Sequence, residues 1–266
     1  MENETQKSSL DVFCIIGIIL GSISCIGLVS TISRIMYNKN YYSGHLFSIL
    51  VMLLISDLFS NFSFMSYFIF NQKYCEVQTI FMVFSDTSML LWNLILVLKT
   101  FQFFSFRENM KKRGWFICIL VGYFFPAFIA LSGSLFEIYG SSSKWCYIID
   151  PVIGFLFSII QLLIYGFNIF ITIFAKRFYY ENIHENEDVS RYSKYYSILR
   201  FSYVHIFAFI FGVINRFIIL LGSFSAILDI IVIIIYNSIG ILNFLVFHCS
   251  FKEIDEEEPS LFETLN

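Results

Sequence analysis

The sequence predicts an all-α membrane protein in which seven hydrophobic helices cross the bilayer. Of the 266 residues, 58% are hydrophobic and only 14% are charged, whereas a soluble domain carries about 25% charged residues. Seven apolar segments are long enough to cross a hydrocarbon core of about 30 Å, which takes roughly 20 residues of helix. The connections between them are short, so we expect no soluble domain between the helices.

The segments are expected to be helices rather than strands. A membrane-spanning strand is about ten residues long and alternates in polarity, but these segments are continuous apolar runs. In lipid, a single run of this kind satisfies its own backbone only as a helix. Within a transmembrane domain of residues 12–249, we place the helices at residues 12–36, 45–70, 76–104, 114–137, 151–177, 198–222 and 227–249.

The distribution of basic residues predicts the orientation of the chain. All of the 17 Lys and Arg residues except Lys7, Lys73, Lys144 and Arg216 fall at one end of the helices. The excess of Lys and Arg marks the cytoplasmic side. We therefore expect an extracellular N-terminal tail at residues 1–11, an acidic cytoplasmic tail at residues 250–266, and a multi-pass protein of the plasma membrane.

Two of the six cysteines are placed to meet outside the membrane. Cys75 opens the third helix on the outer side, and Cys146 lies in the second outer loop. These two are the cysteines expected to reach each other in an oxidising environment, so we predict a disulfide between them. It would hold the loop across the outer opening of the bundle. The alternative is that both remain free thiols.

Polar and small residues recur at helical spacing on four of the helices. They should face the interior of the bundle, because lipid offers them no hydrogen-bond partner. The third helix carries Thr79, Met82, Asp86 and Asn93, the fifth Gln161, Tyr165, Asn168 and Thr172, the sixth His205, Gly212 and Arg216, and the seventh Asp229, Tyr236, Gly240 and Asn243. A purely structural membrane protein would not need such a polar interior.

We interpret five of these inward-facing positions as contacts of a ligand that enters from outside, namely Asp86, Gln161, Tyr165, Asn215 and Arg216. An alternative, which we weigh equally, is that Asp86 and Arg216 are ion-pair partners that neutralise each other.

A second group is interpreted as a conformational switch. Asp57, midway along the second helix, is expected to lie near Asn243 and to act with Asn243 and Gly240 rather than with the ligand. His205 is expected near the inner end of its helix as a hydrogen-bonded residue.

The inner loops carry basic residues that suit a cytosolic partner with an acidic face. The expected contacts of such a partner are Arg107, Lys111, Lys112, Arg113 and Arg191. The alternative is attraction to anionic lipids of the bilayer, worth about 1 kcal/mol per basic side chain. The sequence has no long basic run, so we do not expect nucleic acid as a partner.

Four local patterns occur in a characteristic order along the chain. They are Ser56-Asp57-Leu58, then Cys75 and Gln78 with Trp145-Cys146, then residues 211–216 ending in Ile214-Asn215-Arg216, and finally residues 240–247 beginning Gly240-Ile241-Leu242-Asn243. Together they resemble the cyclic-AMP-receptor-like family, the class E G-protein-coupled receptors of slime moulds and fungi. The resemblance implies a seven-helix bundle of the G-protein-coupled-receptor type, an extracellular ligand and a heterotrimeric G protein.

The sequence departs from that family at the position before Gly240, where Ile239 replaces the usual Gln, and in its short tail. A cyclic nucleotide is an anion, and the outer opening offers few cations beyond Arg216, Lys73 and Lys144. The resemblance therefore carries over the receptor class and not the ligand.

Other classes of seven-helix protein fit less well. The third helix has no Asp-Arg-Tyr at its inner end and the seventh has no Pro, which disfavours the rhodopsin-like class. A retinal-binding pump would need a lysine in the seventh helix. The four histidines are scattered, so we expect neither a metal site nor an enzyme, and no cofactor. A seven-helix transporter of small solutes remains the alternative, although the sequence shows no internal repeat.

Overall fold

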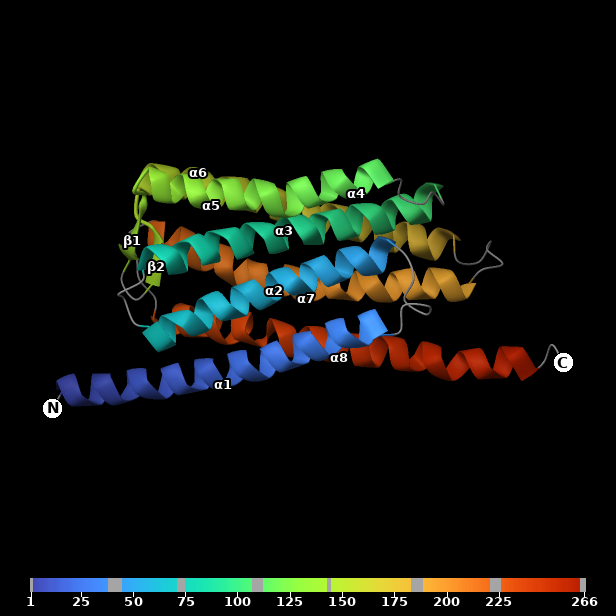
Figure 1. Ribbon diagram of the computed structural model, residues 1–266, viewed down its shortest axis with the longest axis horizontal. Helices are drawn as coiled ribbons and strands as arrows, with labels where there is room; N and C mark the ends of the chain where they lie inside the picture. Colours follow the sequence, from blue (N-terminus) through green and yellow to red (C-terminus); the bar gives the residue numbers. More distant parts are fainter. Residues whose placement is uncertain are drawn as a thin grey trace.

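The computed structural model of the chain is a bundle of long helices that run side by side (Figure 1). It describes the backbone of residues 2–37, 45–70, 75–106, 112–142, 145–182, 189–220 and 226–263. Side chains are described within residues 15–37, 45–66, 75–105, 114–140, 148–181, 195–219 and 227–251.

Seven spans are apolar enough to cross a membrane, each over 22 to 31 residues, and the predicted seven-helix membrane bundle is confirmed. Six of the spans are single helices: α1 (Glu2–Tyr37), α2 (His45–Phe70), α3 (Cys75–Phe106), α6 (Pro151–Asn182), α7 (Val189–Leu220) and α8 (Ala226–Glu263). The helix α1 begins at the opposite end of the bundle from the end of α8, as an odd number of crossings requires (Figure 1).

The fourth span is broken into three parts. It consists of α4 (Lys112–Ile119), the π-helical turn η2 (Leu120–Phe124) and α5 (Phe125–Leu135). Gly122 in η2 lies against the indole of Trp92 and leaves no room for a Cβ atom, and its carbonyl accepts a hydrogen bond from Ser88 at 2.7 Å. The π turn thus fits this span closely to α3.

The fourth span also ends earlier than residue 137, where the sequence analysis placed its end. Glu137 has a positive φ of 54°, and the amides of Glu137 and Ile138 donate to the carbonyls of Ser134 and Gly133 at 3.1 Å. This pattern is a Schellman cap, which terminates a helix with one residue in the left-handed region.

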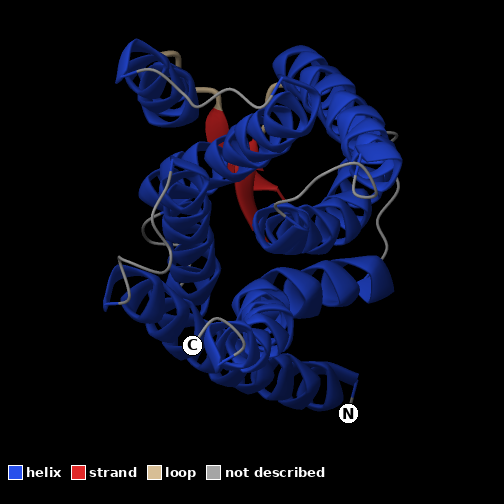
Figure 2. Cartoon of the chain, turned by 90° about the vertical axis from the view of Figure 1, so that its right-hand side faces the viewer, coloured by secondary structure: helices blue, strands red, loops and turns tan. Residues whose placement is uncertain are grey.

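A two-stranded hairpin follows, which the sequence analysis did not predict. Strands β1 (Tyr139–Ser142) and β2 (Trp145–Ile148) pair antiparallel, with Ser141 opposite Cys146. Both strands contact α3, and the hairpin is seen between the helices in the end-on view (Figure 2). We call the end of the bundle that carries the hairpin the outer end and the other the inner end. Which side of the membrane each faces stays a prediction.

Tyr139 anchors the hairpin to the fourth span. Its hydroxyl donates to the carbonyl of Ala130 at 2.8 Å, and Gly133 lies so close to the phenol that a Cβ there would clash with it. Burial raises the pKa of the Tyr139 phenol to about 12.

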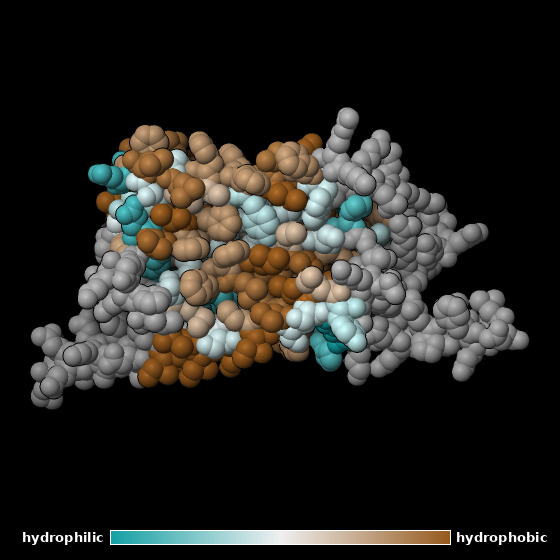
Figure 3. Space-filling model, viewed as in Figure 1, coloured by the Kyte–Doolittle hydropathy of each residue, from teal (hydrophilic) through white to brown (hydrophobic). Residues whose placement is uncertain are grey.

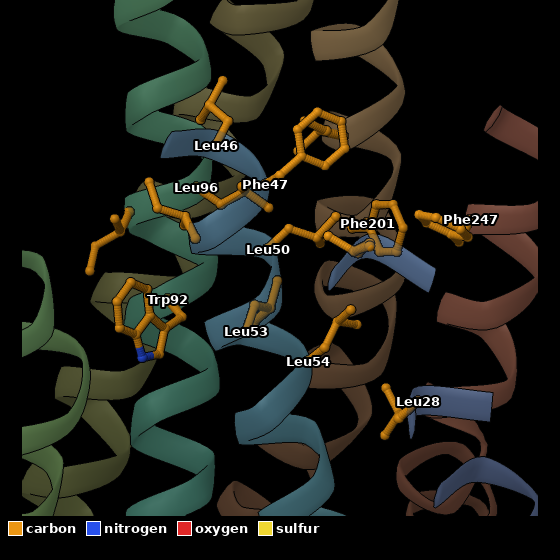
Figure 4. Close-up of a cluster of buried hydrophobic side chains, with 14 of the residues drawn as sticks. Leu28, Leu46, Phe47, Leu50, Leu53, Leu54, Trp92, Leu96, Phe201 and Phe247 are labelled. Atoms are coloured by element: carbon orange, nitrogen blue, oxygen red, sulfur yellow. The ribbon is translucent and has the colours of Figure 1, made fainter. Parts of the chain in front are cut away.

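The inner half of the bundle is filled with apolar side chains. Six helices contribute to one cluster (Figure 4), which includes Leu28 of α1, Leu50, Leu53 and Leu54 of α2, Trp92 and Leu96 of α3, Cys118 of α4, Phe201 of α7 and Phe247 of α8. Apolar side chains also cover much of the outer surface of the bundle (Figure 3). An apolar surface of this extent suits lipid rather than water.

The seventh helix extends further than the predicted 227–249, because α8 continues to Glu263. Ser250 and Phe251, assigned to the tail by the sequence analysis, are buried. The Phe251 ring lies 5.7 Å from that of Phe47 and 4.9 Å from that of Phe247, so apolar packing continues beyond residue 249.

Candidate functional site

The polar stripes on α3, α6, α7 and α8 face the interior of the bundle. Asp86, Asn93, Gln161, Asn168, His205, Asp229 and Asn243 are all buried, and Arg216 is 16% exposed. Their side chains form two groups at different depths. We call them the central cluster and the outer cluster.

The central cluster consists of Asp57 on α2, His205 on α7 and Asn243 on α8. Asp57 Oδ1 lies 2.9 Å from His205 Nε2, and Asn243 Nδ2 donates to Asp57 Oδ2 at 2.7 Å. The expected proximity of Asp57 and Asn243 is therefore observed. Both oxygens of this buried carboxylate are hydrogen-bonded, and one residue from each of three helices is joined at a single point.

The remaining nitrogen of His205 fixes the number of protons in this cluster. Nδ1 lies 2.8 Å from the carbonyl oxygen of Phe201, which only accepts, so Nδ1 carries a hydrogen. The 2.9 Å contact between Nε2 and Asp57 then holds one further proton. Wherever that proton lies, Asp57 and His205 together have no net charge, which is the arrangement that a low-dielectric interior favours.

The expectation that His205 lies near the inner end of its helix is wrong. His205 is ten residues into the span Tyr195–Ile219, which places it about 15 Å from the start of that span at 1.5 Å per residue. This depth is about half of the hydrocarbon core. The span begins further toward the inner end than the predicted residue 198, and the histidine is correspondingly deeper.

Apolar residues lie immediately inward of each member of the central cluster. Leu53, Phe201 and Phe247 stand one helical turn from Asp57, His205 and Asn243, respectively, and all three are at most 2% exposed. The central cluster therefore lies directly against the apolar packing of the inner half. A helix that moves at the cluster would also displace the apolar side chain one turn further inward.

Gly240 holds α1 and α8 together beside the central cluster. Its amide donates to Ser24 Oγ at 2.8 Å. A Cβ atom at this position would lie 2.5 Å from the backbone oxygen of Ser24 and 2.7 Å from the side chain of Leu28. The close approach of the two helices thus requires glycine here.

The outer cluster is built around Arg216 of α7. Its guanidinium donates to Asp86 of α3 and to Gln161 of α6, so the ion pair that the sequence analysis held open as an alternative is present. Beside Arg216, Asn215 Nδ2 donates to Asp229 Oδ1 of α8 at 2.8 Å. The outer cluster therefore joins α3, α6, α7 and α8. Asp229 was recognised as part of a polar stripe but not as a neighbour of Asn215.

Tyr165 does not join the outer cluster through its hydroxyl. The Tyr165 hydroxyl donates to the backbone carbonyl of Ile206 at 2.9 Å, and this bond ties α6 to α7. The structure brings together the other four residues expected to contact a ligand, either directly or through adjacent positions on α7.

Four buried polar atoms of the outer cluster have no hydrogen-bond partner among the described residues. They are Asp86 Oδ1, Gln161 Nε2, Asn215 Oδ1 and Asp229 Oδ2. Buried polar groups in proteins are normally paired, and an exception calls for a ligand, water or ion. The outer cluster therefore has unused hydrogen-bonding capacity on each of its four helices.

The helices α7 and α8 connect the two clusters. His205 and Arg216 are eleven residues apart on α7, or about 16 Å at 1.5 Å per residue. On α8, Tyr236 stands midway in sequence between Asp229 and Asn243. Its hydroxyl lies so close to Gly212 of α7 that a Cβ atom on Gly212 would be only 2.6 Å from it. Movement of α7 against α8 would therefore affect both clusters together.

The inner ends of α3, α6 and α7 are closed by aromatic packing. Tyr179 of α6 stacks on Tyr196 of α7 with ring centroids 4.2 Å apart, and Tyr195 meets Phe103 of α3 at 3.9 Å. Arg200 donates to Ser250 Oγ of α8 at 3.1 Å. These contacts hold the three helices together at their inner ends.

Several predicted residues fall outside the described side chains. Lys112 and Arg113 belong to α4 and Arg191 to α7, but only their backbone is described, while Arg107 and Lys111 lie outside the described residues altogether. Their role as contacts of a cytosolic partner stays a prediction.

Cys75 is bonded in a disulfide, whereas Cys25, Cys118 and Cys249 are not disulfide-bonded. The side chain of Cys146 is not among those described, so its pairing with Cys75 stays a prediction. The contact of β2 with α3 agrees with it. Among the described residues, no group of three or more His, Cys, Asp or Glu side chains is arranged to hold a metal ion.

These features define a seven-helix membrane protein with a polar interior. No protein-family model matches the chain. A curated relative, the cyclic AMP receptor-like protein A of Dictyostelium discoideum, is 30% identical over 112 residues, which are 42% of this chain. The matched region spans only 29% of the length of that protein. The chain is thus similar, over part of its length, to a protein named as receptor-like.

Proposed function

We propose that this chain is a G-protein-coupled receptor that senses an extracellular ligand at the outer cluster and transmits the signal to a heterotrimeric G protein at its inner end. The observation that carries the proposal is the arrangement of two polar clusters, at two depths, on the same pair of helices. Similarity to a protein named as receptor-like supports the class.

The outer cluster supplies the ligand contacts in this proposal. Its unpartnered atoms belong to side chains that are more than nine-tenths buried, so a ligand that pairs them regains hydrogen bonds that the free protein lacks. A ligand shifts a conformational equilibrium only by its difference in affinity for the two states. An arrangement of α7 and α8 that presents these atoms better is therefore the state that the ligand selects.

The central cluster transmits that shift toward the inner end. Movement of α7 or α8 breaks or lengthens a bond to Asp57, because that one carboxylate holds both helices to α2. Phe201 and Phe247 then move with their helices. Separation of the stacked Tyr179 and Tyr196 would free the inner ends of α6 and α7. A G protein would dock there, beside the basic residues of the inner loops.

The direct test is nucleotide exchange by purified G proteins in the presence of the purified chain in lipid nanodiscs. Exchange should accelerate with a ligand of a broad panel, and Arg216→Ala should alter the response while the amount of folded protein stays normal. If no candidate G protein exchanges nucleotide faster across the panel, the proposal fails. Saturable solute uptake into sealed vesicles, abolished by Asp57→Asn or Asp86→Asn, would instead identify a transporter.

A further inference from the structure

The chemistry of the outer cluster narrows the ligand that it can bind. The orientation of both amides is fixed by their charged partners. The Arg216 guanidinium only donates, so the oxygen of Gln161 faces it and Nε2 is left free. Nδ2 of Asn215 donates to the carboxylate of Asp229, and Oδ1 of Asn215 is left without a partner among the described residues.

The atoms left over are mostly acceptors. Asp86 Oδ1, Asn215 Oδ1 and Asp229 Oδ2 accept hydrogen bonds, and Gln161 Nε2 is the single donor among the four. An anion such as a phosphate needs donors, and it would face two carboxylates in a poorly solvated site. Asn215 Oδ1 and Asp229 Oδ2 belong to two side chains that are hydrogen-bonded to each other, so a ligand that brings its own donors could satisfy both.

The charges of the outer cluster favour the same kind of ligand. Arg216 is already paired with Asp86, whereas the carboxylate of Asp229 accepts from the amide of Asn215. Asp229 lies in the first turn of α8. Glu76, Glu137 and Asp150 also lie at the outer end of the bundle, where Lys73 and Lys144 of the loops fall outside the described residues. The described carboxylates attract cations toward the site.

We infer that the outer cluster is a binding site for a small protonated amine, held by Asp229 and Asn215, and not for a cyclic nucleotide or another phosphate. This inference rests on the proposed function in taking the outer cluster as the ligand site. An ammonium group carries three donors and a charge, which suit the free oxygens of this pair and the carboxylate of Asp229. Gln161 Nε2 then donates to an acceptor elsewhere on the ligand.

The test measures binding directly. The full chain in lipid nanodiscs is titrated with primary amines of increasing size (ethylamine, putrescine, spermidine and tyramine), with the alcohol of the same skeleton for each, and with cAMP, AMP and inorganic phosphate. Thermal unfolding reports stabilisation by each probe. At least one amine should raise the unfolding temperature in a saturable way, and its matched alcohol and the three anions should not.

Asp229→Asn is the discriminating variant, because it keeps the shape of the side chain and removes its charge. The amine should bind about tenfold more weakly or worse. Ser238→Ala, at a half-buried position further along the same helix, should bind it as the wild type does. Arg216→Gln separates the two charge hypotheses by sign. Loss of the guanidinium frees Asp86, so an amine should bind more tightly, whereas a phosphate site would lose its cation and its ligand.

The inference is overturned if no amine of the panel stabilises the chain, if an anion does so instead, or if Asp229→Asn binds the amine unchanged. Amine binding without any G-protein nucleotide exchange would leave the inference standing and count against the proposed receptor function. Nucleotide exchange driven by cAMP would support the proposed receptor function and overturn the inference of an amine site.

Discussion

Two buried carboxylates, Asp57 and Asp86, occupy similar helical environments but are used differently. Both oxygens of Asp57 are hydrogen-bonded, one to His205 and one to Asn243. Asp86 is paired with Arg216 through one oxygen, and the other has no partner among the described residues. Asp57 is also fully enclosed, while Arg216 keeps 16% of its side chain exposed.

The difference teaches that burial alone does not identify a ligand site in a membrane protein. A polar group that is fully paired within the protein holds helices together, and a ligand would have to break its bonds first. A group with a free lone pair, connected to the surface through a partly exposed partner, gains a bond when a ligand arrives. The central cluster has one buried atom without a partner among the described residues, Asn243 Oδ1, against four in the outer cluster. By this criterion the outer cluster is the better placed to bind a ligand and the central cluster to respond.

The sharpest way to break this comparison is to remove each carboxylate in turn. Asp57→Ala leaves His205 and Asn243 buried without their partner, and we expect a loss of about 3 kcal/mol in the free energy of unfolding, as for other broken buried pairs. Asp86→Ala should cost about 1 kcal/mol, because Arg216 keeps Gln161 and can turn toward the water. Unfolding in nanodiscs, followed by temperature or denaturant, measures both.

Asp57→Asn provides the matched control. Its NH₂ group can donate to Nε2 of His205, which accepts once the carboxylate is gone, and its oxygen can still accept from Asn243 Nδ2, so most of the stability should return. Equal losses in Asp57→Ala and Asp86→Ala would contradict the distinction between the two clusters.

Variants of two glycines compare the packing of α8 against α1, at Gly240, with the packing of α7 against α8, at Gly212. Gly240→Ala should cost about 2 kcal/mol, because its Cβ would meet the backbone of Ser24 at 2.5 Å and the helices must separate. Gly212→Ala should cost less than 1 kcal/mol, because the obstacle is the hydroxyl of Tyr236 at 2.6 Å, the end of a movable side chain.

Gly166→Ala serves as the control for these two variants. A Cβ at Gly166 would have nothing within 4 Å, so alanine should stabilise α6 by up to about 1 kcal/mol through its higher helix propensity. A loss in Gly212→Ala as large as that in Gly240→Ala would mean that α7 and α8 are as rigidly packed as α1 and α8.

Much of this arrangement was predictable from the sequence, because lipid imposes simple rules. Apolar length defined the seven spans, and helical spacing showed that Asp86, Asn168 and Asn243 face inward. The partners of these residues were harder to predict. The depth of His205 depended on where its span begins, and the bond between Asn215 and Asp229 depended on how α7 and α8 are aligned across a connection. Periodicity within one helix carries no information on either.

Two smaller features of the fold were not predicted, because they too depend on contacts between different elements. The π turn at Gly122 depends on the bulk of Trp92 on another helix, and the β1–β2 hairpin depends on contacts with α3. For Tyr165, the sequence correctly predicted a place in the inward-facing polar stripe, but not its hydrogen-bond partner, the backbone carbonyl of Ile206.

Tyr165→Phe tests whether Tyr165 contacts the ligand of the outer cluster. Because the hydroxyl donates to the α7 backbone, its removal should lower the stability of the bundle by about 0.6 kcal/mol, the average for such bonds between membrane helices. The affinity of any ligand of the outer cluster should stay within about twofold of the wild type. A much larger loss of affinity, with stability unchanged, would return Tyr165 to the set of ligand contacts.

The smallest effect is expected at the hairpin that covers the outer end. The pKa of Tyr139 is raised to about 12 by burial, from an ordinary value of 10, so the folded hairpin binds this proton more tightly than the unfolded chain does. Its stabilising contribution is complete below pH 10 and is lost as the pH rises from about 10 to 12. Tyr139→Phe has no proton to lose, and the difference in unfolding temperature between wild type and variant should fall with pH across this range. Ionisation would cost the hydrogen bond to Ala130 and loosen β1 where it lies against the fourth span. If the difference between the two proteins is the same at pH 9 and near pH 12, the phenol is open to solvent and the hairpin does not cover the outer end as tightly as the inner end is packed.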